Sequence, residues 1–159
     1  MVNQLLIGCA DEPEANANKN LSNARPAPTF DSAREGVKDN KDELSSLIKM
    51  PFEPEDLAWK EFAPDKNGRR LLVVFQLLPD DSRRLADRLA KSGNGAPVTI
   101  KVEKWYPTEL ITGNEVTGEE GLAATSYPAT DFFQQPFLEG TVARVGTSDF
   151  FVLDLMARQ

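Results

Sequence analysis

The chain of 159 residues contains no histidine and only one cysteine, Cys9. The absence of histidine excludes a Ser-His-Asp triad, the commonest general base near neutral pH and every histidine metal ligand. A single cysteine can form neither an internal disulfide nor a thiolate zinc site. No run reaches the roughly 18–20 consecutive apolar residues that a membrane-spanning helix needs. We therefore expect no metal centre, no cofactor and no recognisable catalytic residue.

Acidic residues outnumber basic residues, and the two kinds are distributed unevenly along the chain. The net charge of −7 opposes binding to nucleic acid, whose phosphates attract Lys and Arg. Residues 69–104 hold eight basic and four acidic residues (net +4), whereas residues 105–159 hold two basic and eight acidic residues (net −6). Two interpretations stay open: the two parts pack together and their fields partly cancel, or the basic part attracts an anionic partner.

The N-terminal nine residues end in Leu6-Ile7-Gly8-Cys9. These residues resemble the lipobox of bacterial lipoproteins, in which a small residue precedes the cysteine that receives the lipid. The resemblance implies that Cys9 is lipidated and that residues 1–9 are the remnant of a signal that starts upstream, because residues 1–7 lack its basic region. It also implies a protein of the bacterial cell envelope, held in the periplasm by a lipid anchor. A cytoplasmic protein with an incidental cysteine is the alternative.

The following segment, residues 10–28, carries four Asn and three Pro and has almost nothing to bury. Such a composition cannot offset the entropy lost on ordering. It predicts a flexible polar tether between the membrane and a folded domain. The alternative is an ordinary frayed terminus, with the short apolar start docked on the domain.

Hydrophobic periodicity predicts the elements of the domain. The unbroken apolar run Leu71–Phe75 indicates a central strand that is buried on both faces. Asn40 followed by Glu43 is typical of a helix start, and Gly146–Asp149 separates two apolar stretches as a hairpin turn does. The segment 111–127 is expected to be a polar loop.

Together these signals predict one α+β domain over residues 29–159, with a mixed or antiparallel sheet of four to five strands and two main helices. The expected helices span residues 40–49 and 82–91, and the expected strands span 56–63, 70–77, 97–104, 137–145 and 150–156. The connection between the second and third strands is either a βαβ crossover or an antiparallel return.

Aromatic residues give the first candidate site. Eight of the thirteen aromatic residues follow residue 104, and Trp105-Tyr106-Pro107 closes an expected strand. A rigid aromatic corner can stack against a sugar, a peptide or a protein partner. The same rings can equally fill the core, where large aromatic side chains are usually buried.

The helix 82–91 gives the second candidate. Arg84, Arg88 and Lys91 fall on one stripe of this helix and could meet an anionic lipid, a polysaccharide or an acidic protein. The alternative is a solvated helix face on which Asp87 pairs with Arg83 and Lys91.

Carboxylates give two weaker candidates. The loop 113–121 carries Asn114 and three Glu, which suit a hard cation, but its spacing does not match a calcium-binding loop. Paired acids hydrolyse glycosides without histidine when they face each other across a cleft. Glu109, Asp131 and Glu139 lie near aromatic residues and are eligible for that role.

The sequence therefore predicts a non-enzymatic envelope lipoprotein domain that acts as an interaction or structural module, with the membrane and an envelope protein or glycan as partners and no nucleic acid. The first alternative is a small-molecule or glycan binding domain that uses Trp105 and Tyr106. The second alternative is a carboxylate-dependent hydrolase.

Overall fold

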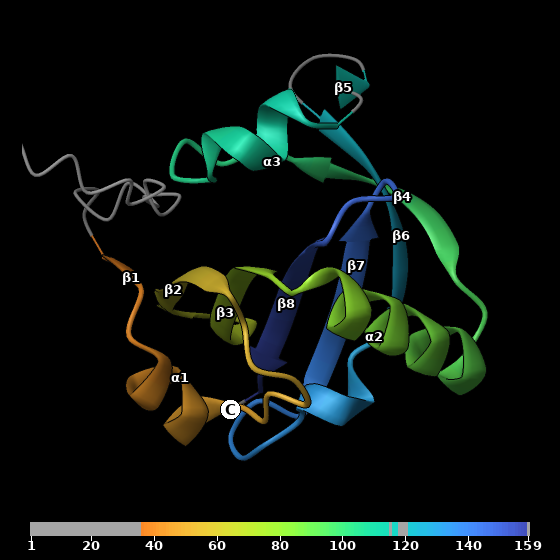
Figure 1. Cartoon of the computed structure of the whole chain (residues 1–159). Coiled ribbons are helices and arrows are strands. Elements are labelled where there is room, and N and C mark those ends of the chain that lie inside the picture. Colours follow the sequence, from red (N-terminus) through yellow and green to blue (C-terminus); the bar gives the residue numbers. More distant parts are fainter. Residues whose placement is uncertain (1–35, 115, 118–120, 159) are drawn as a thin grey trace, which may run out of the picture.

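The computed structural model describes residues 36–114, 116–117 and 121–158 of the chain. These residues form one antiparallel sheet of eight strands (Figure 1). Seven strands follow one another in the order β1-β2-β3-β8-β7-β6-β4, and β5 pairs with β6 beside this path. The strands are β1 (Val37–Lys38), β2 (Asp56–Asp65), β3 (Gly68–Gln76), β4 (Ala96–Lys101), β5 (Val116–Thr117), β6 (Gly121–Pro128), β7 (Glu139–Val145) and β8 (Phe150–Ala157).

The expected α+β fold with four to five strands is wrong, because the described residues are mostly β. Two main helices accompany the sheet, α1 (Lys41–Leu47) and α2 (Pro79–Ser92). The short helix α3 (Thr108–Thr112) and the 3₁₀ turn η1 (Thr130–Phe132) complete the structure. The signal remnant 1–9 with Cys9 and the tether 10–28 lie outside the described residues. Within the part of the chain that is described, no helix is both long enough and apolar enough to cross a membrane.

The expected central strand is confirmed. β3 lies between β2 and β8, and its residues Leu71–Phe75 are at most 3% exposed. Because side chains alternate along a strand, Leu71, Val73 and Phe75 join one core and Leu72 and Val74 join another. A strand that is buried on both faces reads as a continuous apolar run, and here it does so within an antiparallel sheet.

The helix and hairpin signals are confirmed too. Asn40 is the N-cap of α1, and its side chain accepts hydrogen bonds from the N–H groups of Asp42 and Glu43 at 2.9 and 3.1 Å. β7 and β8 pair directly as the expected hairpin. Since every neighbouring pair is antiparallel, β3 and β4 run in the same direction, and α2 crosses over three intervening strands to the edge strand β4.

The expected loop over 111–127 is wrong in its second half, where β6 lies between β4 and β7. The pattern was weak because Leu122 is the one large residue among the buried residues of β6; the others are Gly121 and Ala124, and they are followed by Thr125 and Ser126. Alanine has little β propensity of its own. Pairing with both neighbouring strands stabilises β6 instead, and this pairing is not visible in the local sequence.

The sheet has two unlike faces. The first face carries α1 and α2, whose Leu44, Ile48, Leu85 and Leu89 pack against a core that includes Phe75, Phe132 and Phe151. The second face carries the segment from Trp105 to Leu110, which includes the start of α3 (Figure 1). We call the second face the groove face, because part of it is left open beside β4.

Candidate functional site

The two aromatic candidates lie on the groove face. Trp105 and Tyr106 are each 5% exposed, and their rings meet edge to face with centroids 4.9 Å apart. Both belong to the core of this face, together with Leu110 and Leu122. The Trp105 ring is therefore closed off from a stacking ligand, and its Nε1–H has no hydrogen-bond acceptor among the described residues.

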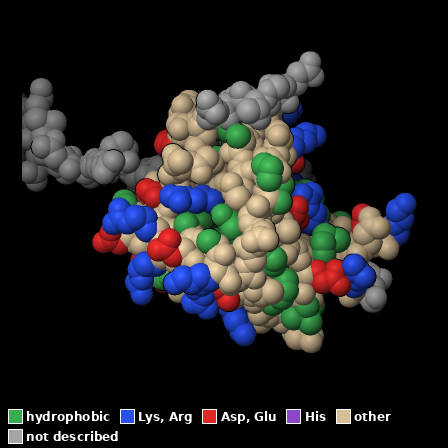
Figure 2. All heavy atoms as spheres, turned by 90° about the vertical axis from the view of Figure 1, so that its right-hand side faces the viewer, with side chains coloured by type: hydrophobic (Ala, Val, Ile, Leu, Met, Phe, Trp, Pro, Cys, Tyr) green, Lys and Arg blue, Asp and Glu red, His purple; other side chains and the backbone are tan. Residues whose placement is uncertain are grey.

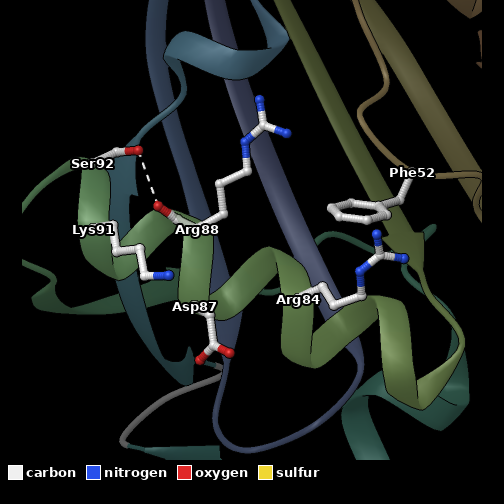
Figure 3. A pocket seen from close by; sticks show the side chains of 6 residues that line it. All are labelled: Phe52, Arg84, Asp87, Arg88, Lys91 and Ser92. Atoms are coloured by element: carbon white, nitrogen blue, oxygen red, sulfur yellow. Dashed lines mark hydrogen bonds between the residues drawn. The ribbon is translucent and has the colours of Figure 1, made fainter.

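The basic candidates lie across the sheet, on α2. Arg84, Arg88 and Lys91 do line one shallow pocket of about 470 Å³, together with Phe52, Asp87 and Ser92 (Figure 3). The structure thus brings these three residues together, as the helical spacing predicted. It places them on the opposite face from Trp105 and Tyr106, so the two candidate sets do not form one site.

Two of the four charged side chains that line the α2 pocket, those of Arg84 and Arg88, already pair within the chain. The Arg84 guanidinium lies over the Phe52 ring, 5.2 Å from its centroid, and pairs with Asp81 at 3.0 Å. Arg88 Nε lies 2.6 Å from Asp131 Oδ2 and links α2 to η1. Figure 3 shows the Arg84 and Arg88 side chains pointing away from Lys91, and Figure 2 shows basic and acidic side chains mixed on the side that carries α2. The contacts of Arg84 with Phe52 and of Arg88 with Asp131 attach the helix to its neighbours, whereas the Arg84–Asp81 pair lies within α2.

The alternative pairing of Asp87 with Arg83 and Lys91 is not what the structure shows. Arg83 pairs with Asp80 one turn earlier. Asp87 has no ion pair among the described residues and lies in the same pocket as Lys91, where its charge opposes binding of an anion. An anionic partner on α2 therefore stays a prediction from sequence that this geometry does little to favour.

The carboxylate candidates lie on different elements. Asp131 is bound to Arg88 on the α2 side, Glu139 Oε2 pairs with Arg158 Nε at 2.8 Å at the start of β7, and Glu109 lies on α3. The loop 113–121 lies partly outside the described residues. Within those that are described, no three His, Cys, Asp or Glu side chains gather as they would around a metal ion.

A groove of about 450 Å³ opens on the groove face beside β4. Its floor follows the strand register. Val152 of β8 lies opposite Ala143 of β7, which lies opposite Ser126 of β6. The next residues on the same face of the sheet are two positions away along each strand. There Leu72 of β3 lies opposite Asp154 of β8, and Asp154 lies opposite Thr141 of β7. The register therefore sets an apolar patch beside a row of hydroxyl groups.

A wall of the groove comes from β4 and the segment that follows it. Val98 is 36% exposed and Ile100 is partly buried against the core of this face. Glu103 and Tyr106 continue this wall beyond the end of the strand. Along β4 every residue except Ile100 is exposed.

An ion pair lies at one end of the groove. Arg70 Nε donates to Asp154 Oδ1 at 2.9 Å, and Arg70 Nη2 donates to Asp154 Oδ2 at 2.8 Å. The hydrogen bonds to Asp154 raise the pKa of Arg70 above its ordinary value. The two side chains are about 40% exposed (41% and 39%). The guanidinium also lies over the Phe62 ring, 5.2 Å from its centroid. A two-pronged pair of this kind holds both groups in a fixed geometry.

Tyr106 lies close to this pair. Burial raises the pKa of its hydroxyl far above the ordinary value, the charges of Glu103 and Asp154 raise it further, and Arg70 lowers it in part. The hydroxyl therefore stays protonated and is able to donate a hydrogen bond to a ligand.

No protein-family model, curated protein or solved structure matches this chain. What the groove can bind follows from the chemistry of its lining.

Sequence reasoning found Tyr106 but missed the rest of the groove. In the sequence, Arg70 stands at the start of the expected strand 70–77, and Asp154 stands within the expected hairpin strand 150–156. Asp154 is the sequence feature that could have indicated this site, because a carboxylate inside the apolar run Phe150–Met156 needs a partner across the sheet. The distance of 84 residues between Arg70 and Asp154 concealed which partner that is.

Proposed function

We propose that this protein is a non-enzymatic binding module whose groove holds a small amphipathic molecule. The observation that carries the proposal is one concave site that joins an apolar floor to fixed polar groups. Leu72, Ala143 and Val152 supply the floor, and the Arg70–Asp154 pair supplies fixed polar groups at one end. Binding sites for small molecules typically combine a mostly apolar lining with a few well-placed polar groups.

This proposal corresponds to the first alternative from sequence, with one change. Both rings are buried, so the support for a stacked sugar is weak, but Tyr106 lines the groove and Trp105 does not. Tyr106 rather than Trp105 is the aromatic residue that we propose for ligand contact.

A dye-binding experiment tests the groove. Nile red, a neutral apolar dye, is titrated against the full chain and against Thr141→Trp, which places an indole in the groove at an exposed position. We expect saturable binding by the parent chain and a loss of about tenfold or more in the variant, since the added ring occupies the cavity. The matched control is Thr147→Trp in the exposed turn between β7 and β8. The proposal fails if the parent chain shows no saturable binding, or if both variants bind alike.

We also propose, on Leu6-Ile7-Gly8-Cys9 alone, that the module is lipid-anchored in the bacterial envelope with residues 10–28 as its tether. Metabolic labelling with a clickable fatty acid tests this in cells that carry the complete gene. The label should appear on the parent protein and disappear in Cys9→Ala. An unlabelled parent chain that keeps residues 1–8 would instead indicate a cytoplasmic protein.

A further inference from the structure

The charges around the groove are not balanced. Arg70 is neutralised by Asp154 through the two hydrogen bonds at 2.9 and 2.8 Å. Glu103 lines the same groove and has no ion-pair partner among the described residues. Lys101 also borders the groove, but along β4 its side chain alternates with that of Ile100, which packs into the core of the groove face. Glu103 also lies close enough to Arg70 for its charge to raise the pKa of the guanidinium further, so one guanidinium faces two carboxylates and the three groups together leave one negative charge.

The groups around Glu103 suit a positive charge. Tyr106 lies beside Glu103, with its N–H donating to the Glu103 carbonyl at 3.0 Å, and its hydroxyl remains neutral. Both Glu103 and Asp154 lie close enough to Tyr106 to act on its titration. An incoming carboxylate would meet both of these negative charges, and the one guanidinium is already held by Asp154. An incoming ammonium group would pair with Glu103, and its three N–H donors match a carboxylate and neighbouring hydroxyl groups.

The rest of the groove suits an apolar chain. Leu72, Ala143 and Val152 form the floor, and Val98 and Ile100 form the wall toward β4. Val98 is one of three large hydrophobic side chains that are strongly exposed among the described residues. Covering such surface is favourable in proportion to the apolar area removed from water. The net charge of −7 adds a general attraction for cations.

We propose that the groove binds an organic cation that carries a hydrocarbon chain. Its primary ammonium group lies at Glu103, and its chain lies over Leu72, Ala143 and Val152. This inference rests on the proposed function and adds the sign of the ligand's charge.

Three probes with one hydrocarbon chain test the inference: octylammonium, octanoate and 1-octanol, each titrated into the ¹⁵N-labelled chain and followed by amide shifts along β7, β8 and β4. We expect octylammonium to bind about threefold to fivefold more tightly than 1-octanol, as a partly exposed ion pair allows, and octanoate to bind more weakly than 1-octanol. Raising the salt concentration should shrink the difference.

A pair of variants assigns the effect to one residue. Glu103→Gln should bring the affinity for octylammonium down to that for 1-octanol and leave the 1-octanol affinity unchanged. Glu109→Gln removes the same charge from α3, outside the groove, and should keep the preference for octylammonium. The inference is overturned if octanoate binds as tightly as octylammonium, or if Glu103→Gln leaves the preference intact. In that case binding of 1-octanol at the groove would still support the proposed function, whereas shifts by none of the three probes would remove both.

Discussion

Asp56 is the first residue of β2, and the pKa of its carboxyl group is clearly raised in the folded chain. Its side chain accepts a hydrogen bond from the N–H of Leu57 at 2.8 Å. Burial raises the pKa of Asp56 from its ordinary value of 3.8 to about 6. The Leu57 hydrogen bond lowers it, and the negative charges of Glu109, Asp39 and Glu55 raise it again. Asp56 therefore keeps its proton to a higher pH in the folded chain than in the unfolded chain.

The sign of the effect on stability follows from this difference. Between about pH 4 and pH 6 the folded state binds more protons than the unfolded state, so the free energy of unfolding falls as the pH rises. The contribution of Asp56 is fully present below pH 3.8 and is lost as the pH rises through about 6. A difference of about two between the pKa values corresponds to at most about 3 kcal/mol, and solvent screening of a half-buried carboxyl reduces it to about 1 kcal/mol.

The test compares the parent chain with Asp56→Asn, whose amide oxygen can still accept from Leu57 and carries no charge. Urea unfolding is measured at pH 4.0 and pH 7.5 through the fluorescence of Trp59 and Trp105, which are both buried. We expect similar stabilities at the lower pH and a variant that is more stable by about 1 kcal/mol at the higher pH.

The control is Asp87→Asn on the exposed side of α2, which removes an equal charge without the burial. Its difference from the parent chain should be nearly the same at both pH values. If Asp56→Asn instead gains its stability equally at both pH values, or more at pH 4.0, then burial of the carboxyl is not what sets its titration.

Three further variants test other parts of the structure. Ser82 is fully buried in α2, and its hydroxyl has no hydrogen-bond partner among the described residues, so Ser82→Ala should raise the melting temperature by about 3–5 °C, and a lowered value would contradict this. Gly140 has a φ of +140°, and a Cβ there would lie 2.1 Å from the Asp154 carbonyl oxygen. Gly140→Ala should therefore cost about 3 kcal/mol or more in urea unfolding, whereas Gly93→Ala, with its nearest contact at 3.5 Å, should cost under about 1 kcal/mol. A double-mutant cycle of Arg70→Ala and Asp154→Ala should give a coupling energy of about 1 kcal/mol, and additive effects would show that the pair contributes nothing.

The elements that could be predicted from sequence are those whose stabilising interactions are local. The Asn40 cap of α1 depends on N–H groups two and three residues away, and the β7–β8 hairpin depends on a short turn. The apolar run of β3 is long enough to show burial on both faces without any knowledge of its neighbours. In each case the pattern and the physical cause lie within about ten residues.

The elements that were missed depend on distant residues. β6 is a strand because β4 and β7 lie on either side of it, and its alanines give no signal alone. β1 has two residues and exists because it pairs with Lys60 and Trp59 of β2. The groove has the same origin, since Arg70, Thr141 and Asp154 become neighbours only through the register of three strands.

The edge strand β4 links the fold to the proposed function. An exposed apolar edge would ordinarily invite pairing with a further strand. Here Pro97 lacks the N–H that such pairing needs, and Lys101 places a charge at the other end of the strand. Pro97 and Lys101 therefore disfavour pairing of β4 with a strand of another chain, while Val98 and Ile100 of β4 line the groove. Val98→Thr should therefore weaken binding of 1-octanol without changing the oligomeric state, whereas a change from dimer to monomer would show that β4 serves assembly instead.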